Sequence, residues 1–256
     1  MRIKPVLLSL SALAAFTAGA GAAHANLIVN GNFEQTSYGS NKQLAANGLT
    51  AAFSGGTRST LSGWTSSNGG DGGYNFVLNA ATATTTSSAL RLKGDSTGGI
   101  ASPNGGNFFA SDPLYYPGTL SQTISGLTVG TSYLLTFDYA LAQQSGFNGP
   151  NSNDFWQVSF GNEVLTTAPL SSSDGSFSGW KSASMSFTAT GVSEVLSFLA
   201  KGSSPGAPPF MLLDSVAMKA ATTVPEPSTL SMLLGGVCVA GLLARRRRNN
   251  DKHRQA

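Results

Sequence analysis

Short apolar segments with a two-residue period recur along the chain, and this pattern constrains the fold more than any other feature. From Tyr133 to Tyr139, every second side chain is Tyr, Leu, Phe or Tyr, whereas the residues between them are Leu, Thr and Asp. The segment from Ala183 to Thr188 places Ala, Met and Phe at alternate positions. Successive side chains of a strand point to opposite faces, so these segments predict strands with one buried face and one solvent-exposed face.

Residues 26–221 show about ten such segments, separated by Gly- and Asn-rich turns, and no sustained helical period. Many short strands with turn signals favour an all-β fold, here an antiparallel β-sandwich of the jelly-roll type. The stretches 35–62 and 94–106 are expected to be loops that are longer than packing needs, and therefore functional or mobile. We expect one domain from about 200 residues.

The first 25 residues have the three-part layout of a secretory signal peptide. Arg2 and Lys4 precede an uncharged apolar run over residues 6–20, which ends in Ala23-His24-Ala25. A permanent N-terminal anchor is the alternative, but the run is short and no stop-transfer charges follow it. We expect residues 1–25 to form a signal helix that engages the Sec export machinery and is removed after Ala25.

Residues 222–249 have the layout of a membrane tag. An apolar segment, 230–244, is followed by Arg245, Arg246, Arg247 and Arg248. A helix of this length measures roughly 22 Å against a hydrocarbon core of ~30 Å, so snorkelling arginines and local thinning must complete the span. The arginines favour a cytoplasmic side. We expect one short transmembrane helix in the inner membrane, a cytoplasmic tail at 250–256, and residues 26–221 outside.

The string VPEPSTLSMLLGGVCVAGLLARRRR is similar to the PEP-CTERM sorting signal of Gram-negative bacteria. The resemblance implies that an exosortase in the inner membrane reads Pro225, Glu226 and Pro227 and cleaves the tag. The precursor would then be delivered to the cell envelope surface or an extracellular matrix. An ordinary C-terminal anchor with a chance Pro-Glu-Pro is the alternative.

Composition excludes several function classes for the segment between the two ends. It holds ten acidic and seven basic residues, which disfavours nucleic-acid binding because that requires a basic face. The two histidines, His24 and His253, and the single cysteine, Cys238, all lie in the terminal segments. Histidine-based triads, cysteine nucleophiles and ordinary zinc sites are therefore excluded there.

Several motifs between the ends resemble galactose-binding-like jelly rolls, a group that includes carbohydrate-binding modules. They are NLIVNGNFE, LSGW at 61–64, LSQTISGLTVGTSYLLTFDYA, GWKSASMSFTA and FMLLDSVAMKA. The resemblance implies a structural calcium where the first and last strands meet, with Glu34 and Asp214 as ligands. Calcium accepts carboxylate and carbonyl oxygens. The alternative is that both carboxylates end their strands in solvent or pair with Lys or Arg.

Sugar recognition uses an aromatic platform and a few polar groups. Tyr115 and Tyr116, between two prolines, suggest an exposed pair, and Trp156 and Asp154 are further candidates. Trp64 and Trp180 occupy positions that the resemblance places in the core. For most aromatic residues burial is the competing outcome.

We therefore expect a non-catalytic, exported surface or matrix protein that is delivered by its C-terminal signal and that binds polysaccharide. No catalytic residue is assigned. The alternative is a secreted glycan-active hydrolase, because a glycosidase needs only two carboxylates at about 5–9.5 Å, but no spacing among the acidic residues selects a pair.

Overall fold

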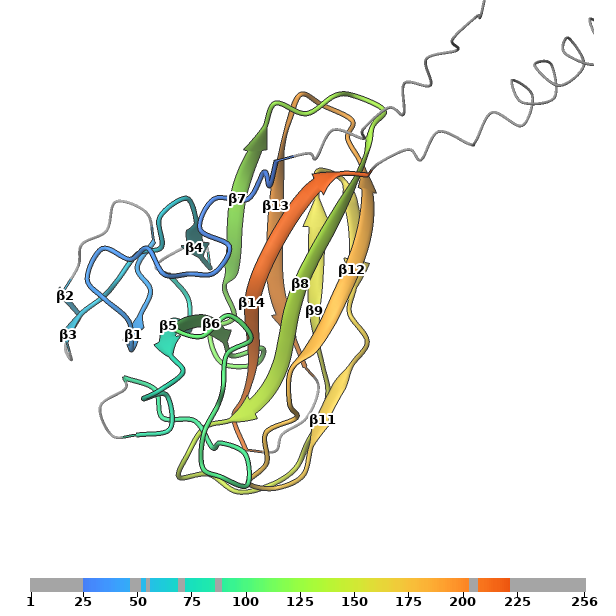
Figure 1. The fold of residues 1–256 in the computed structure, drawn as a ribbon. Coiled ribbons are helices and arrows are strands. Elements are labelled where there is room, and N and C mark those ends of the chain that lie inside the picture. The colour runs from blue at the N-terminus through green and yellow to red at the C-terminus, as the bar shows by residue number, and fades with distance from the viewer. Residues whose placement is uncertain are drawn as a thin grey trace, which may run out of the picture. The chain divides into compact units, whose positions relative to one another are not determined.

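Two antiparallel β-sheets pack face to face in the computed structural model (Figure 1). The structure describes residues 25–46, 52–53, 56–68, 72–85, 89–202 and 207–221. The predicted signal helix, apart from Ala25, and the predicted transmembrane helix at 230–244 lie outside these residues. Within them, no helix is long and apolar enough to cross a membrane.

Fourteen strands are present in the described residues, and every pairing between them is antiparallel. The first sheet has the order β1 (Lys42–Gln43), β5 (Asn75–Asn79), β6 (Asn107–Ser111), β14 (Pro209–Ala220), β8 (Ser132–Gln143) and β12 (Lys181–Thr188). The second has the order β10 (Glu163–Thr166), β9 (Asn151–Phe160), β13 (Ser193–Lys201), β7 (Thr119–Ser125) and β4 (Thr65–Ser67), with β11 (Leu170–Ser172) also on β9. A hairpin of β2 (Ala52–Phe53) and β3 (Gly56–Thr57) stands apart. The predicted all-β antiparallel sandwich is confirmed.

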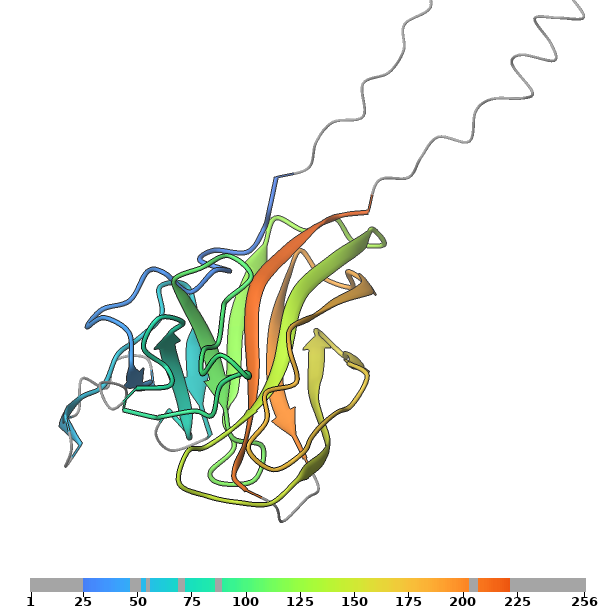
Figure 2. The ribbon, with the colours of Figure 1, turned by 60° about the horizontal axis from the view of Figure 1, so that its bottom comes forward.

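The main core lies between the two sheets. Figure 2 shows β14 and β8 side by side in one layer, and their register joins Leu212 to Ala140. The alternate residues of β8 predicted to face inward, from Tyr133 to Tyr139, are all buried. On β12, Met185 and Phe187 are buried as predicted. Trp64 is also buried, at 2% exposure, as the resemblance to galactose-binding-like jelly rolls implies.

The first sheet is buried on its second face too, along β5, β6 and β14. Phe76, Phe108 and Phe210 belong to a separate apolar cluster, which also contains Leu90 and Ile100 from the connection between β5 and β6. This second cluster explains why β5, β6 and β14 have continuous apolar runs instead of alternation. The predicted loop 94–106 contains no strand and contributes Ile100 to this cover.

Two of the short apolar segments counted among the predicted strands, 27–29 and 89–92, and the predicted loop 35–62 differ from the structure in detail. The segment 27–29 runs along β14, with the Leu27 N–H donating to the Met218 carbonyl at 2.8 Å, but it is not a strand because Val29 bonds the Gln122 side chain instead of a backbone. Residues 89–92 form only an isolated bridge, since their leucines cover the sheet. The stretch 35–62 is not all loop, because it contains β1, β2 and β3.

Candidate functional site

The loop between β6 and β7 exposes a pair of tyrosines. Tyr115 is 57% exposed and Tyr116 is 63% exposed, and their rings meet edge to face with centroids 4.8 Å apart. Tyr115 also packs against Tyr74, with ring centroids 5.0 Å apart. At the base of the loop, one oxygen of Asp112 accepts hydrogen bonds from the backbone N–H groups of Leu114, at 2.7 Å, and Tyr115, at 2.9 Å. Both tyrosines are exposed, as the sequence predicts for a pair between two prolines.

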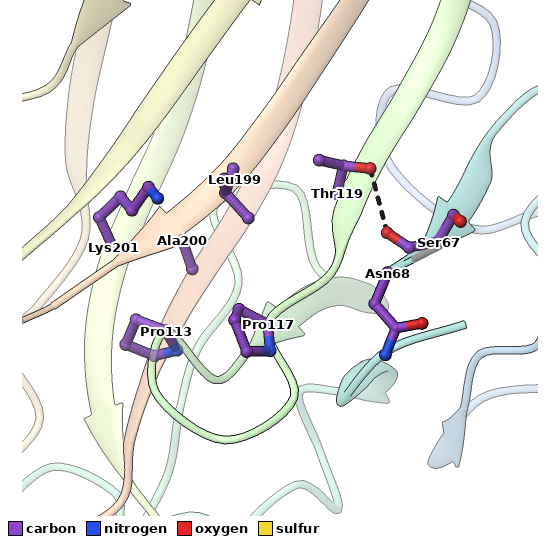
Figure 3. A pocket seen from close by; sticks show the side chains of 8 residues that line it. All are labelled: Ser67, Asn68, Pro113, Pro117, Thr119, Leu199, Ala200 and Lys201. Carbon is purple, nitrogen blue, oxygen red and sulfur yellow. Dashed lines mark hydrogen bonds between the residues drawn. The ribbon is translucent and has the colours of Figure 1, made fainter. Parts of the chain in front are cut away.

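A cavity of about 400 Å³ lies beside this loop, at one end of the second sheet (Figure 3). Its lining combines two loop prolines, small polar groups and one lysine: Ser67, Asn68, Pro113, Pro117, Thr119, Leu199, Ala200 and Lys201. Sheet register sets three of these residues in a row, because Thr119 pairs with Ser67 on one side and with Leu199 on the other. The Thr119 hydroxyl donates to the Ser67 carbonyl at 3.1 Å.

The outer face of the second sheet next to this row consists of small hydroxyl side chains. Ser121, Ser197 and Ser159 lie side by side on β7, β13 and β9, and Thr65 on β4 precedes them. The hydroxyls of Ser159 and Ser197 are 2.6 Å apart and hydrogen-bonded. The cavity therefore lies next to a row of small hydroxyl side chains, and the exposed Val195 lies beside this row on β13.

Trp156 does not belong to this surface, so its predicted role as a sugar platform is wrong. Its side chain is fully buried, and its indole N–H donates to the Leu212 carbonyl at 3.0 Å. The ring packs against Phe109 and Phe198 with centroids 5.9 and 6.1 Å apart. On β9, alternate residues from Asp154 to Phe160 point into the sandwich, and Trp156 is one of them.

Asp154 is also fully buried and cannot contact a sugar in solvent, so its prediction as a glycan contact is wrong as well. Neither of its carboxyl oxygens has a hydrogen-bond partner in the described part of the chain. Burial, and then the charge of Asp112, raises the pKa of Asp154 to about 7. Burial also raises the pKa of Asp112, although the amides of Tyr115 and Leu114 oppose the change.

Glu34 and Asp214 both contact one loop, residues 102–107. The Asn107 N–H donates to Glu34 at 2.6 Å, and the Ser102 hydroxyl donates to Asp214. Asp214 is fully buried, and desolvation raises its pKa to about 6. A Cβ atom at Gly106 would lie 2.1 Å from a Glu34 oxygen, so glycine is needed for this approach.

Calcium takes oxygen ligands, and the two carboxylates and the Ser102 hydroxyl are such groups. The contacts of Glu34 and Asp214 described above are made by the Asn107 N–H and the Ser102 hydroxyl, and Lys93 pairs with a different carboxylate, Asp174. Among the described residues, no group of three or more His, Cys, Asp or Glu side chains could hold a metal ion.

Sequence reasoning missed Asp112 and the residues that line the cavity. Ser67, Thr119 and Lys201 come from three strands, and only the sheet register brings them together. For Asp112 a local signal existed: an Asp-Pro pair follows the apolar run of β6 and precedes the two tyrosines.

Three solved structures illustrate the similarity of this chain to known folds. A carbohydrate-binding module described as TmCBM61 in complex with β-1,4-galactotriose has 12% identity and a TM-score of 0.39, over 77% of this chain and 99% of that one. The CBM22-1 xylan-binding domain of Xyn10C from Paenibacillus barcinonensis has 11% identity and a TM-score of 0.35, over 79% and 98%. The MgGH51 α-L-arabinofuranosidase has 15% identity and a TM-score of 0.41, over 82% and 28%.

No curated protein matches the sequence of this chain. A family model does match its C-terminal part, over residues 223–248. These residues include Pro225, Glu226 and Pro227 and the four arginines from Arg245 to Arg248. The chain thus carries a PEP-CTERM protein-sorting motif, which indicates an exported, membrane-anchored precursor.

Proposed function

We propose that this protein is a non-catalytic surface or matrix protein whose sandwich domain, residues 26–221, binds polysaccharide. One observation carries the proposal: the exposed pair of Tyr115 and Tyr116 stands beside a cavity of about 400 Å³ that adjoins a row of serine and threonine hydroxyls. Aromatic rings stack on the apolar face of sugars, and hydroxyl and amide groups bond their hydroxyls. The Asn68 amide, the Thr119 hydroxyl and the Lys201 ammonium group supply polar groups in the cavity.

The alternative function, a glycan hydrolase, has less support. Such an enzyme needs two carboxylates that reach the substrate. Among the described residues, neither the cavity beside the tyrosine pair nor another cavity, of about 350 Å³ near Asn30 and Ser215, is lined by Asp or Glu. Asp112 and Asp154 are close in space, but their exposure of 1% and 0% keeps them from a polymer.

Polysaccharide binding tests the proposal through the tyrosine pair. Tyr115→Ala and Tyr116→Ala are each expected to weaken binding at least about tenfold, which corresponds to a loss of ~1.4 kcal/mol. Affinity electrophoresis against a panel of plant, algal and bacterial polysaccharides measures the effect. Tyr38→Ala, at a position 49% exposed and outside the cavity lining, is the matched control and should leave binding unchanged. Equal retardation of the wild-type and both variants by every polymer that binds would refute the assignment.

For the C-terminal motif, we propose recognition and cleavage by an exosortase after export through the Sec machinery and insertion into the inner membrane. Replacing Pro225, Glu226 and Pro227 by alanine is expected to leave the uncleaved precursor in the inner-membrane fraction, because the enzyme loses its recognition element. Immunoblots of fractionated cells check this. Ser228→Ala, next to the motif, is the control, and a triple variant that is processed at the wild-type rate would contradict the proposal.

We further propose that Glu34 and Asp214 hold a structural calcium at the junction of the N-terminal segment and β14. Calcium bound there would neutralise the Glu34 and Asp214 carboxylates, which both contact the 102–107 loop. Asp214→Asn is expected to bind one calcium fewer per chain and to lose part of the rise in Tm that calcium gives. Equilibrium dialysis and thermal melts measure both. An unchanged number of bound ions in this variant would exclude the site.

A further inference from the structure

The loop between β6 and β7, residues 112–118, is called the tyrosine loop below. The end of the sandwich next to it buries polar side chains that have no hydrogen-bond partner among the described residues. Asp154 is 0% exposed and Asn151 is 1% exposed, and both lie on β9. Neither oxygen of Asp154 and neither polar atom of Asn151 forms a hydrogen bond in the described part of the chain. Buried polar groups in folded proteins are almost always paired, and each unpaired one costs about 1–3 kcal/mol. Four such atoms on one short segment call for a ligand.

A β-bulge turns both side chains to the same face. Asp154 is opposite Leu170 and Asn151 is opposite Ser172, so three residues of β9 match two of β11. Asn153 absorbs the extra residue with a φ of 61°. Without this bulge, residues 151 and 154 would point to opposite faces of the sheet. The bulge therefore gathers two oxygen-bearing side chains inside the sandwich.

Ser111 approaches the same place from the opposite sheet. Phe109 on β6 contacts Trp156 on β9, with ring centroids 5.9 Å apart. Ser111 follows Phe109 by two residues and Asp154 precedes Trp156 by two, each on the same inward face. β6 is antiparallel to β14, and β14 and β9 point the same way in Figure 1, so Ser111 and Asp154 lie toward the same end. The buried Ser111 hydroxyl also has no partner among the described residues.

Asp112 completes the group. Its carboxylate is 1% exposed and lies close enough to Asp154 for its charge to act on that residue. Gly202, which follows β13, lies next to both segments, since a Cβ atom there would lie 2.1 Å from a carboxyl oxygen of Asp154 and 3.0 Å from Pro113. Within the described residues, neither carboxylate forms an ion pair with lysine or arginine. Two neighbouring buried carboxylates without a cation are unfavourable.

We propose that Asp112 and Asp154, together with the amide oxygen of Asn151 and the hydroxyl of Ser111, bind a calcium ion. All four donors are oxygens, and two carry charge, which is the ligand set of calcium and not of zinc or copper. Water in the coordination shell would accept hydrogen bonds from the side-chain N–H groups of Asn151. Protonation of Asp154 would remove its charge but leave the Asn151 amide and the Ser111 hydroxyl unpaired. The site is distinct from Glu34 and Asp214, which contact the 102–107 loop.

The ion would also brace the tyrosine loop. Asp112 accepts hydrogen bonds from the Leu114 and Tyr115 amides, so fixing its carboxylate fixes the start of the loop. Polysaccharide binding would then depend on calcium without any contact between the ion and the sugar. This consequence rests on the proposed function, whereas calcium binding is measured with no polysaccharide present.

Calcium binding to the purified full-length chain in detergent tests the site. After removal of metal with a chelator, equilibrium dialysis against calcium chloride is expected to show one ion fewer per chain in Asp154→Asn than in the wild-type. Asp214→Asn should keep the ion at Asp154, which separates the two sites. Asp174→Asn, a substitution of an exposed carboxylate, should change nothing. Equal calcium content in Asp154→Asn and the wild-type would overturn the proposal.

A second variant tests calcium binding at this site if Asp154→Asn does not fold. Asn151→Asp adds a third carboxylate, so it should lower Tm in chelator and tighten calcium binding about tenfold, because ligand charge sets calcium affinity. A purely structural role for Asn151 predicts the lower Tm without the tighter binding, and that result would refute the proposal. Dialysis against magnesium chloride is the final measurement. Equal binding of magnesium and calcium would overturn the assignment to calcium.

Discussion

Trp156→Ala is expected to lower the free energy of unfolding by about 3–5 kcal/mol, the usual cost of removing a fully buried tryptophan. The side chain has no exposed surface and is surrounded by Phe109 and Phe198, so alanine leaves a cavity between the sheets. The Leu212 carbonyl also loses the indole N–H that bonds it at 3.0 Å. For a domain of this size, Tm should fall by about 6–20 °C.

Two further variants separate the contributions of Trp156. Trp156→Phe keeps most of the side-chain volume and removes the hydrogen bond. Its free energy of unfolding should therefore lie between those of the wild-type and Trp156→Ala. Tyr116→Ala removes an aromatic ring that is 63% exposed and should stay within about 0.5 kcal/mol of the wild-type. Denaturant melts measure all three. A Trp156→Ala protein as stable as Tyr116→Ala would contradict the buried position of the indole.

Gly31→Ala should have the second-largest effect, because the new methyl group would meet backbone and not a flexible side chain. A Cβ atom there would lie 1.9 Å from the Val216 carbonyl oxygen. Overpacking of this kind costs about 1–3 kcal/mol. The shift needed to relieve it also disturbs the bond from the Val216 N–H to the Gly31 carbonyl, 2.9 Å long, which ties the N-terminal segment to β14.

Gly99→Ala is the matched control for Gly31→Ala. A Cβ atom at Gly99 would have one neighbour, the Thr97 hydroxyl at 3.9 Å. Both substitutions add the same methyl group, so the difference in their denaturant midpoints isolates the clash with Val216. We expect Gly99→Ala to be neutral or slightly stabilising, since alanine reduces the freedom of the unfolded chain. Equal midpoints would show that the junction of Gly31 and β14 tolerates a side chain.

The sequence by itself determined the class of fold, the buried face of β8 and the sorting motif. Period-two alternation is a local property of a strand, so Tyr133, Leu135 and Phe137 could be placed inside without knowing their partners. The Pro-Glu-Pro motif with its apolar segment and arginines is contiguous as well. The exposed tyrosine pair was predictable for the same reason, because its flanking prolines are neighbours in sequence.

Only the tertiary structure decided what Asp154 and Trp156 do. Nothing in their local sequence shows that the polar segment 151–154 contains a β-bulge. This bulge turns both Asn151 and Asp154 inward. Likewise, the cavity beside Tyr115 is formed by residues whose proximity depends on the pairing of β4, β7 and β13. Register and bulges are set by contacts between distant segments, and such contacts leave no period in the sequence to read.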